Sequence, residues 1–172
     1  EKGIKELLLA MEKNNNSKLL IIGGNFFKST ITENYFKELQ TISNKLQDRI
    51  IFEGYINHDL LPKYIFSCDI AIVPSLCEEA AGLVAIEALA SGLPVIATNM
   101  GGLPEYVDSN AGIIVKNDEN LIKNLSMAIN DLTLNDDLFN AKRKNAKKSV
   151  AEYNVTKYYE NFLKILEEIK WK

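Results

Sequence analysis

The 172-residue sequence has few of the residues that build metal centres, disulfide scaffolds or histidine-based active sites. Its two cysteines, Cys68 and Cys77, are too few and too isolated for a disulfide framework or a zinc site. We interpret them as partly buried thiols of a reducing compartment. The single histidine, His58, is interpreted as a helix-start residue and not as a general base. We therefore expect neither a metal nor a redox cofactor.

Long apolar runs and an excess of basic residues are also missing. No apolar run approaches the roughly 20 residues that cross a bilayer, and no signal-peptide pattern opens the sequence, so we expect a cytoplasmic location. The net charge of −3 leaves no basic excess for neutralising nucleic-acid phosphates. With 47% hydrophobic and 25% charged residues, the composition is that of one ordinary globular domain.

Short apolar runs, most of them bounded by glycine or proline, alternate with segments of helical periodicity. Strands of four to six residues in this alternation predict an α/β fold, a doubly wound parallel sheet with helices on both faces. The expected strands lie at 18–24, 49–54, 69–75, 94–98 and 111–115, and the helical patterns include 4–11, 35–46, 57–65, 82–90, 121–129 and 158–169.

The sequence opens directly on a helical pattern, "EKGIKELL", with no strand before it. A doubly wound domain normally begins with its central strand, so either that strand lies upstream or the sheet is incomplete. We favour a fragment that forms one domain over residues 1–172. The last helix carries aromatic residues, most of which we expect to pack on their own domain: Tyr153, Tyr158, Tyr159, Phe162 and Trp171.

The loop after "DIAIVPS" holds the residues with the clearest chemistry. In open α/β sheets, ligands bind at the carboxyl ends of the strands. Gly82 lets the backbone approach a ligand, and the amides of Leu83 and Val84 begin the next helix. Unpaired amides at the positive end of a helix dipole suit a diphosphate. Gly101 and Gly102 form a second candidate phosphate nest, or simply a turn into a helix.

Two carboxylates flank this helix start. Glu87 lies among apolar residues, and a buried carboxylate is costly unless it is hydrogen-bonded. The two hydroxyls of a ribose would satisfy it, and Glu79 could accept from a second sugar. The alternative is that Glu87 points to solvent from an exposed helix face. The spacing suits a nucleotide-sugar that lies over the helix start.

The stretch "EEAAGLVAIEALASGLPVIATNMGGLPE" resembles the signature of retaining, nucleotide-sugar-dependent glycosyltransferases of the group 1 type with the GT-B fold. The Glu pair with seven residues between matches Glu79 and Glu87, and the pattern that follows matches as well. "EKG", "FEGYI" and "CDIAIVPS" also fall in their expected order, so the resemblance covers essentially the whole chain. It implies a Rossmann-like, donor-binding carboxyl-terminal half of an enzyme whose amino-terminal acceptor domain is absent from this chain.

The resemblance also implies roles for individual residues. Lys2 is then the cation that neutralises the donor phosphates, although a lone lysine near a terminus is otherwise a solvated charge. Glu79 contacts the donor sugar, and Lys2 and Glu79 are the expected catalytic residues. The implied donor-binding residues are Gly23, Gly24, Tyr55, Ile56, Glu79, Ala81, Gly82, Leu83, Val84, Glu87, Gly101 and Gly102.

The sequence departs from the family pattern at two points. The aromatic residue expected before the glycine is Ala81, which predicts looser packing around the sugar. The phosphate-binding arginine would precede Glu1.

The expected reaction transfers a sugar, most simply a hexose from a uridine diphosphate (UDP) carrier, to an acceptor hydroxyl with retained configuration. Polysaccharide or glycolipid synthesis is expected, with peripheral membrane association of the full-length enzyme and no metal. A GT-B-like nucleotide-sugar epimerase and a non-catalytic nucleotide-sugar binding module remain alternatives.

Overall fold

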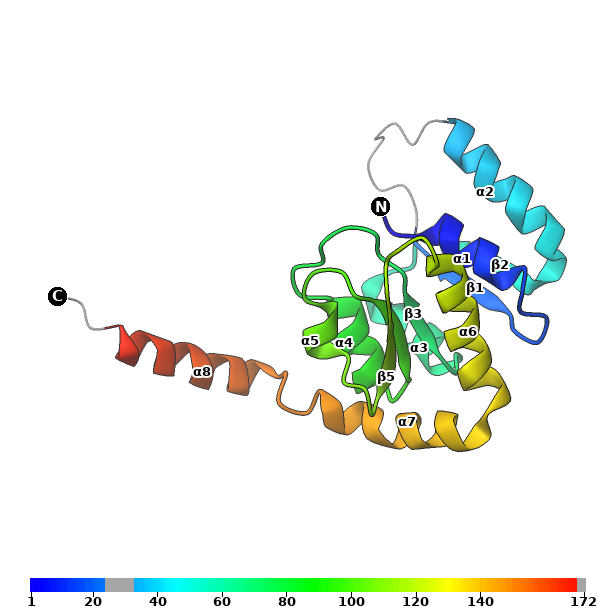
Figure 1. Ribbon diagram of the computed structural model, residues 1–172. Coiled ribbons are helices and arrows are strands. Elements are labelled where there is room, and N and C mark those ends of the chain that lie inside the picture. Colours follow the sequence, from blue (N-terminus) through cyan, green and yellow to red (C-terminus); the bar gives the residue numbers. More distant parts are fainter. Residues whose placement is uncertain (24–32, 170–172) are drawn as a thin grey trace.

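The chain forms an α/β domain with two parallel β-sheets (Figure 1). The computed structural model describes residues 1–23 and 33–169. β1 (Leu19–Ile22) pairs with β2 (Ile50–Gly54). β4 (Val95–Thr98) lies between β3 (Ala71–Val73) and β5 (Gly112–Val115) in the second sheet. Each pairing is parallel, as the alternation of strands and helices predicts.

Helices connect these strands and follow the sequence patterns closely. The connecting helices are α1 (Ile4–Met11), α2 (Glu33–Leu46), α3 (Leu61–Phe66), α4 (Leu83–Ala90), α5 (Leu103–Tyr106), α6 (Leu121–Leu134) and α7 (Asp136–Ser149), and α8 (Val155–Glu168) follows. Two 3₁₀ turns, Gln47–Arg49 and His58–Leu60, precede β2 and α3.

Alternating strand residues pack into two hydrophobic clusters, one on each face of the sheet. Ile96 belongs to the cluster formed with α1, α2 and α6. Its neighbours Val95 and Ala97 belong to the cluster formed with α4, α5 and α7. Side chains of a strand point alternately to opposite faces, so this division places helices on both faces of the sheet. The predicted doubly wound α/β class is confirmed.

A cavity of about 670 Å³ separates the two sheets. Its walls include residues 18–22 along β1 and 70–72 along β3, and most of them are apolar. The backbone of Glu1 lies just beyond the carboxyl end of β3, where the Glu1 carbonyl accepts a hydrogen bond from the amide of Leu76 at 2.8 Å. β1 and β3 thus belong to two separate sheets and are not paired with each other.

α8 departs from the prediction that its aromatic residues pack on their own domain. The helix has no buried residue and extends away from the domain as an arm (Figure 1). Tyr158 is 76% exposed and Val155 86% exposed. Tyr153, which precedes α8, does pack on the domain, with its ring centroid 5.2 Å from that of Tyr106. Amphipathic periodicity predicts the helix but does not identify the surface that covers its apolar face. Trp171 lies outside the described residues.

Candidate functional site

The structure brings Lys2 and Glu79 into contact although they are 77 positions apart in the sequence. Lys2 lies just before α1, and Glu79 lies in the loop after β3. The Lys2 Nζ atom donates to Glu79 Oε1 at 2.5 Å. This hydrogen bond is the main reason why the pKa of Lys2 is raised and the pKa of Glu79 is lowered. Both groups are therefore charged at neutral pH.

Ser75 is a second partner of the Glu79 carboxylate that the sequence interpretation missed. Its side chain is buried, and its hydroxyl donates to Glu79 Oε1 at 2.5 Å. The Ser75 carbonyl in turn accepts from the hydroxyl of Thr98 at 2.6 Å, which links the carboxyl ends of β3 and β4. The available signal was a hydroxyl residue directly after the strand-ending proline, at the ligand-binding edge of the sheet.

Gly101 and Gly102 pack against the backbone of Glu79. The amide of Gly102 donates to the Glu79 carbonyl at 2.7 Å. Gly101 has φ of 56°, and a Cβ added there would lie 2.4 Å from the same carbonyl oxygen. These two positions therefore require glycine to hold the loop that carries Glu79. The turn also leads into α5, as the simpler interpretation of this stretch expected.

Gly82 starts α4 as the sequence predicts. It is the N-cap residue with φ of 53°, and its carbonyl accepts the first helical hydrogen bond, from the amide of Ala85 at 2.8 Å. The amides of Leu83 and Val84 precede that bond, so they belong to the unsatisfied first turn. Both side chains are more than 60% exposed.

Glu87 is not buried, and this part of the sequence interpretation is wrong. Its side chain is exposed, on the same face of α4 as Leu83 and Val84. The opposite face, with Ala85 and Leu89, packs into the core. A spacing of four residues places Glu87 one turn above Leu83. Its neighbours in the sequence are apolar, but they occupy a different face of the helix.

Gly3 in "EKG" is a further residue that the sequence interpretation did not single out. It has φ of 67° at the start of α1, and a Cβ added there would lie 1.8 Å from the carbonyl oxygen of Pro74. The segment that carries Lys2 therefore lies directly on the end of β3. A glycine immediately before an amphipathic helix was the available signal.

The other predicted donor-binding residues lie at the carboxyl ends of β1 and β2. The amide of Gly23 donates to the Gly54 carbonyl at 2.7 Å and joins these two ends. Tyr55 is 63% exposed, and Ile56 is buried. β1 and β2 form one sheet, whereas Glu79 follows β3, which belongs to the other sheet. Gly24 lies outside the described residues.

An aromatic ring lies beside the loop although residue 81 is alanine. Ala81 is half-buried. The ring of Tyr106, from α5, comes within 3.3 Å of a Cβ built on Gly102 and 4.0 Å of one built on Gly82. The Tyr153 hydroxyl donates to the Glu105 carbonyl at 3.4 Å and joins the base of the α8 arm to α5.

Of the remaining predicted features, His58 and Cys68 lie outside this loop, whereas Cys77 lies within it, two residues before Glu79. His58 is exposed and begins a 3₁₀ turn that Asn57 caps by accepting from the amide of Asp59. Cys68 and Cys77 are free thiols. Among the described residues, no cluster of three His, Cys, Asp or Glu side chains is arranged to hold a metal ion. In this same part of the chain, no helix is long and apolar enough to cross a membrane.

Three solved or curated proteins show what the chain is similar to. Sucrose-phosphate synthase from Thermosynechococcus elongatus has a TM-score of 0.83 at 30% identity, over 98% of this chain and 42% of its own. HepE from Anabaena, solved with UDP-glucose, shares the fold, with a TM-score of 0.81 at 23% identity over 98% of this chain and 46% of its own. An uncharacterized glycosyltransferase of Methanocaldococcus jannaschii is 30% identical over 98% of this chain and 43% of its own length.

The chain thus spans less than half the length of each of these proteins. The family model described as "Glycosyl transferases group 1" matches residues 1–149, which include the Lys2–Glu79 pair and the whole glycine-bounded α4. The chain belongs to the group 1 glycosyltransferases, and its fold is that of a domain of the GT-B enzymes.

Proposed function

We propose that this domain binds the nucleotide-diphosphate-sugar donor of a retaining glycosyltransferase. The observation that carries the proposal is the Lys2–Glu79 pair at the carboxyl edge of the sheet, in the loop that leads into α4. A cation, a carboxylate and a helix start within one loop region suit the two chemically different halves of such a donor: an anionic diphosphate and a neutral sugar rich in hydroxyls.

The diphosphate half is proposed to lie over the first turn of α4. Its negative charge grows as the glycosidic bond breaks, so catalysis depends on groups that stabilise this charge. The amides of Gly82, Leu83 and Val84 and the helix dipole provide such stabilisation, and Lys2 adds a full positive charge. Lys2 pairs with Glu79, so donor binding would redirect its ammonium group toward the phosphates. The proposal requires no metal ion.

The two carboxylates are proposed to bind different sugars. Glu79 would accept from hydroxyls of the transferred sugar, because both described contacts use Oε1 and leave Oε2 for a ligand. Glu87 would accept from the ribose hydroxyls. Its exposure on the face shared with Leu83 and Val84 supports access by a ligand that lies along this face.

UDP is the proposed carrier, with a hexose as the transferred sugar. HepE of Anabaena, which shares the fold, has been solved with UDP and glucose and with UDP-glucose. UDP-glucose is therefore the first donor to test. Tyr55 and Ile56, just past β2, are the proposed neighbours of the base, with Gly23 on the floor of the site.

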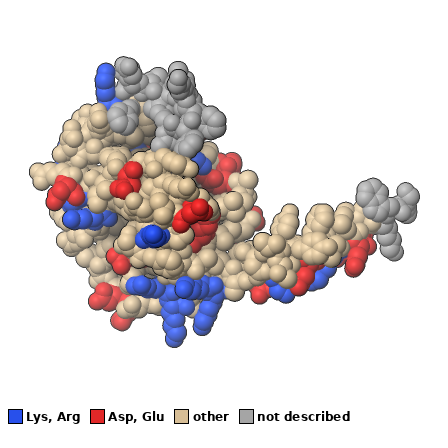
Figure 2. Space-filling model, turned by 180° about the vertical axis from the view of Figure 1, so that it is seen from behind, with Lys and Arg blue, Asp and Glu red and all other residues tan. Residues whose placement is uncertain are grey.

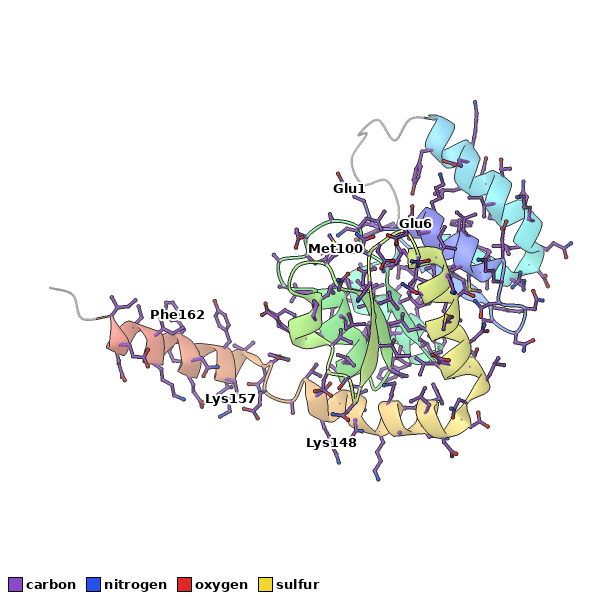
Figure 3. The ribbon with its side chains drawn as sticks, in the orientation of Figure 1. Glu1, Glu6, Met100, Lys148, Lys157 and Phe162 are labelled. Atoms are coloured by element: carbon purple, nitrogen blue, oxygen red, sulfur yellow. The ribbon has the colours of Figure 1, made fainter. Side chains whose placement is uncertain are left out.

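Turnover is proposed to need a partner domain that binds the acceptor, which in GT-B enzymes of this kind is amino-terminal. The relatives are more than twice as long as this chain. Figure 3 shows Phe162 on the side of α8 that faces the same way as Glu1 and Met100, and Lys157 on the opposite side. Phe162 of the arm thus points the same way as the end of the domain that holds the site. We propose that the partner domain covers this side of α8.

The full-length enzyme is proposed to act in the cytoplasm, in polysaccharide or glycolipid synthesis, with peripheral attachment to a membrane. The exposed residues Arg143, Lys144, Lys147 and Lys148 support this attachment. Figure 2 shows basic side chains gathered along the edge of the domain that α7 forms. Anionic lipids attract such clusters. Sedimentation with vesicles that contain phosphatidylserine tests the attachment, and loss of binding in the Lys147→Ala, Lys148→Ala double variant is expected.

Calorimetry with UDP and UDP-glucose tests the donor assignment. Glu79→Gln should keep the affinity for UDP and lose the preference for UDP-glucose, whereas its exposed neighbour Glu78→Gln is the matched control and should change neither. Glu87→Ala should weaken both ligands by about 1–3 kcal/mol, since two hydrogen bonds to a carboxylate are lost. Unchanged affinity in Glu87→Ala contradicts the ribose role. Donor binding without turnover by the full-length enzyme would favour a non-catalytic binding module.

A further inference from the structure

The two oxygens of the Glu79 carboxylate have different surroundings in this structure. Oε1 accepts two hydrogen bonds, from Lys2 Nζ and from Ser75 Oγ, each at 2.5 Å. The two donors differ in freedom: the Lys2 side chain is 65% exposed, whereas Ser75 is only 2% exposed. A lysine on a flexible stem can turn to another anion, but a buried hydroxyl is held in place by its surroundings.

Ser75 is itself held at the junction of two strands. Its carbonyl accepts from Thr98, whose side chain is fully buried at the end of β4. The loop that carries Glu79 is fixed independently, because the Glu79 carbonyl accepts from the amide of Gly102. A serine hydroxyl has a single proton to donate, and here it is directed at Oε1. Both ends of the Ser75–Glu79 hydrogen bond are thus anchored to the end of the sheet.

We propose that Ser75 is a positioning residue that holds Oε1 of Glu79 and thereby directs Oε2 at the donor sugar. This inference rests on the proposed function, in which Glu79 contacts the sugar. The hydrogen bond from Ser75 matters most when a diphosphate draws Lys2 away, because Ser75 is then the remaining described partner of Oε1. Without it, the Glu79 side chain is free to follow Lys2, and the sugar loses its acceptor.

The first test compares how much the sugar adds to nucleotide binding. Calorimetry gives the ratio of the Kd for UDP to the Kd for UDP-glucose in wild type and in Ser75→Ala, Ser75→Thr and Ser91→Ala. Ser91 is the matched control, since its hydroxyl also donates to an acceptor of α4, the Glu87 carbonyl. We expect Ser75→Ala to lower the ratio about tenfold with the UDP affinity unchanged. Ser75→Thr should restore the ratio, and Ser91→Ala should leave it unchanged.

A purely structural role for Ser75 would weaken UDP and UDP-glucose equally, or would lower stability without changing the ratio. Either result overturns the inference. Thermal unfolding of each variant shows whether the domain is folded, and the threonine variant keeps the test decisive if Ser75→Ala is unstable.

The second test does not depend on a donor. Carbon-detected NMR follows the titration of the Glu79 carboxyl group in the ligand-free domain. Loss of the Ser75 hydroxyl should raise the midpoint and threonine should restore it, because a hydrogen bond to the charged form favours that form. The charged group that faces Glu79 is Lys2, which has Glu1 and Cys77 near it. All three residues are unchanged in both variants.

An unchanged midpoint in Ser75→Ala overturns the inference whatever the binding data show. Failure of the wild type to bind UDP-glucose would instead overturn the proposed donor, and the titration would then decide alone whether Ser75 fixes Glu79.

Discussion

Gly3→Ala should damage both the stability of the domain and its donor site. The structure gives two separate costs for the added methyl group. With φ of 67°, residue 3 lies in the left-handed region, where a residue other than glycine costs about 1–2 kcal/mol. The new Cβ would also lie 1.8 Å from the Pro74 carbonyl oxygen. Backbone on both sides must move apart, and such overpacking costs about 1–3 kcal/mol. The expected loss of unfolding free energy is therefore about 2–5 kcal/mol.

Gly92→Ala is the matched control for this substitution. Gly92 also has a positive φ, 90°, but the three atoms nearest to a Cβ there all belong to the side chain of Lys147, the first at 3.1 Å, and this side chain can move away. We expect a loss of about 1–2 kcal/mol in urea unfolding and unchanged binding of UDP-glucose. Gly3→Ala should lose more stability and also weaken donor binding, because it displaces Lys2 from the proposed diphosphate site. Equal effects of the two variants on stability and binding would refute the packing of Gly3 on β3.

Three further predictions concern single features of the domain. Glu79→Gln should be less stable than wild type at about pH 7, and this difference should shrink as the pH falls below 4.5. Lys2 and then Ser75 lower the pKa of Glu79, so its contribution is full above the ordinary value of 4.5 and is lost as the pH falls through the lowered pKa; urea unfolding that shows the same difference across this acid range contradicts this. Lys142→Met should lower the free energy of unfolding by about 1–3 kcal/mol, because the buried ammonium donates to two backbone carbonyls that would lose their donor. An unchanged free energy in urea unfolding would argue against this. Removing the chain from residue 155 onward should leave the unfolding free energy unchanged, because α8 has no buried residue. A loss above about 1 kcal/mol in the same assay would show that the arm packs on the domain.

Local patterns in the sequence were sufficient to predict the fold and the order of its elements. Runs such as "DIAIVPS" and "PVIAT" combine β-branched residues with a bounding proline, and both formed parallel strands. Gly82 was correctly placed at the start of α4. These features depend on neighbours within one turn or one strand, and such local preferences are visible in the sequence.

Contacts between distant segments could not be predicted in the same way. The predicted burial of Glu87 was wrong because residues next to each other in the sequence of a helix point to different faces of that helix. Ser75 was missed because its role depends on the turn that brings Glu79 back to it within one loop, and on Thr98, which contacts it from the next strand. The exposure of α8 could not be predicted because amphipathicity does not identify the covering surface. The Lys2–Glu79 pair required the resemblance to place both residues at one site.

An amide NMR titration of this domain with UDP-glucose tests most directly whether the start of α4 holds the donor diphosphate. We expect the largest shifts on the amides of Gly82, Leu83 and Val84 at the start of α4, with smaller shifts at Lys2 and at the Gly101–Gly102 loop. Unshifted amides at the start of α4, together with saturable binding elsewhere on the domain, would show that this helix start does not hold the diphosphate.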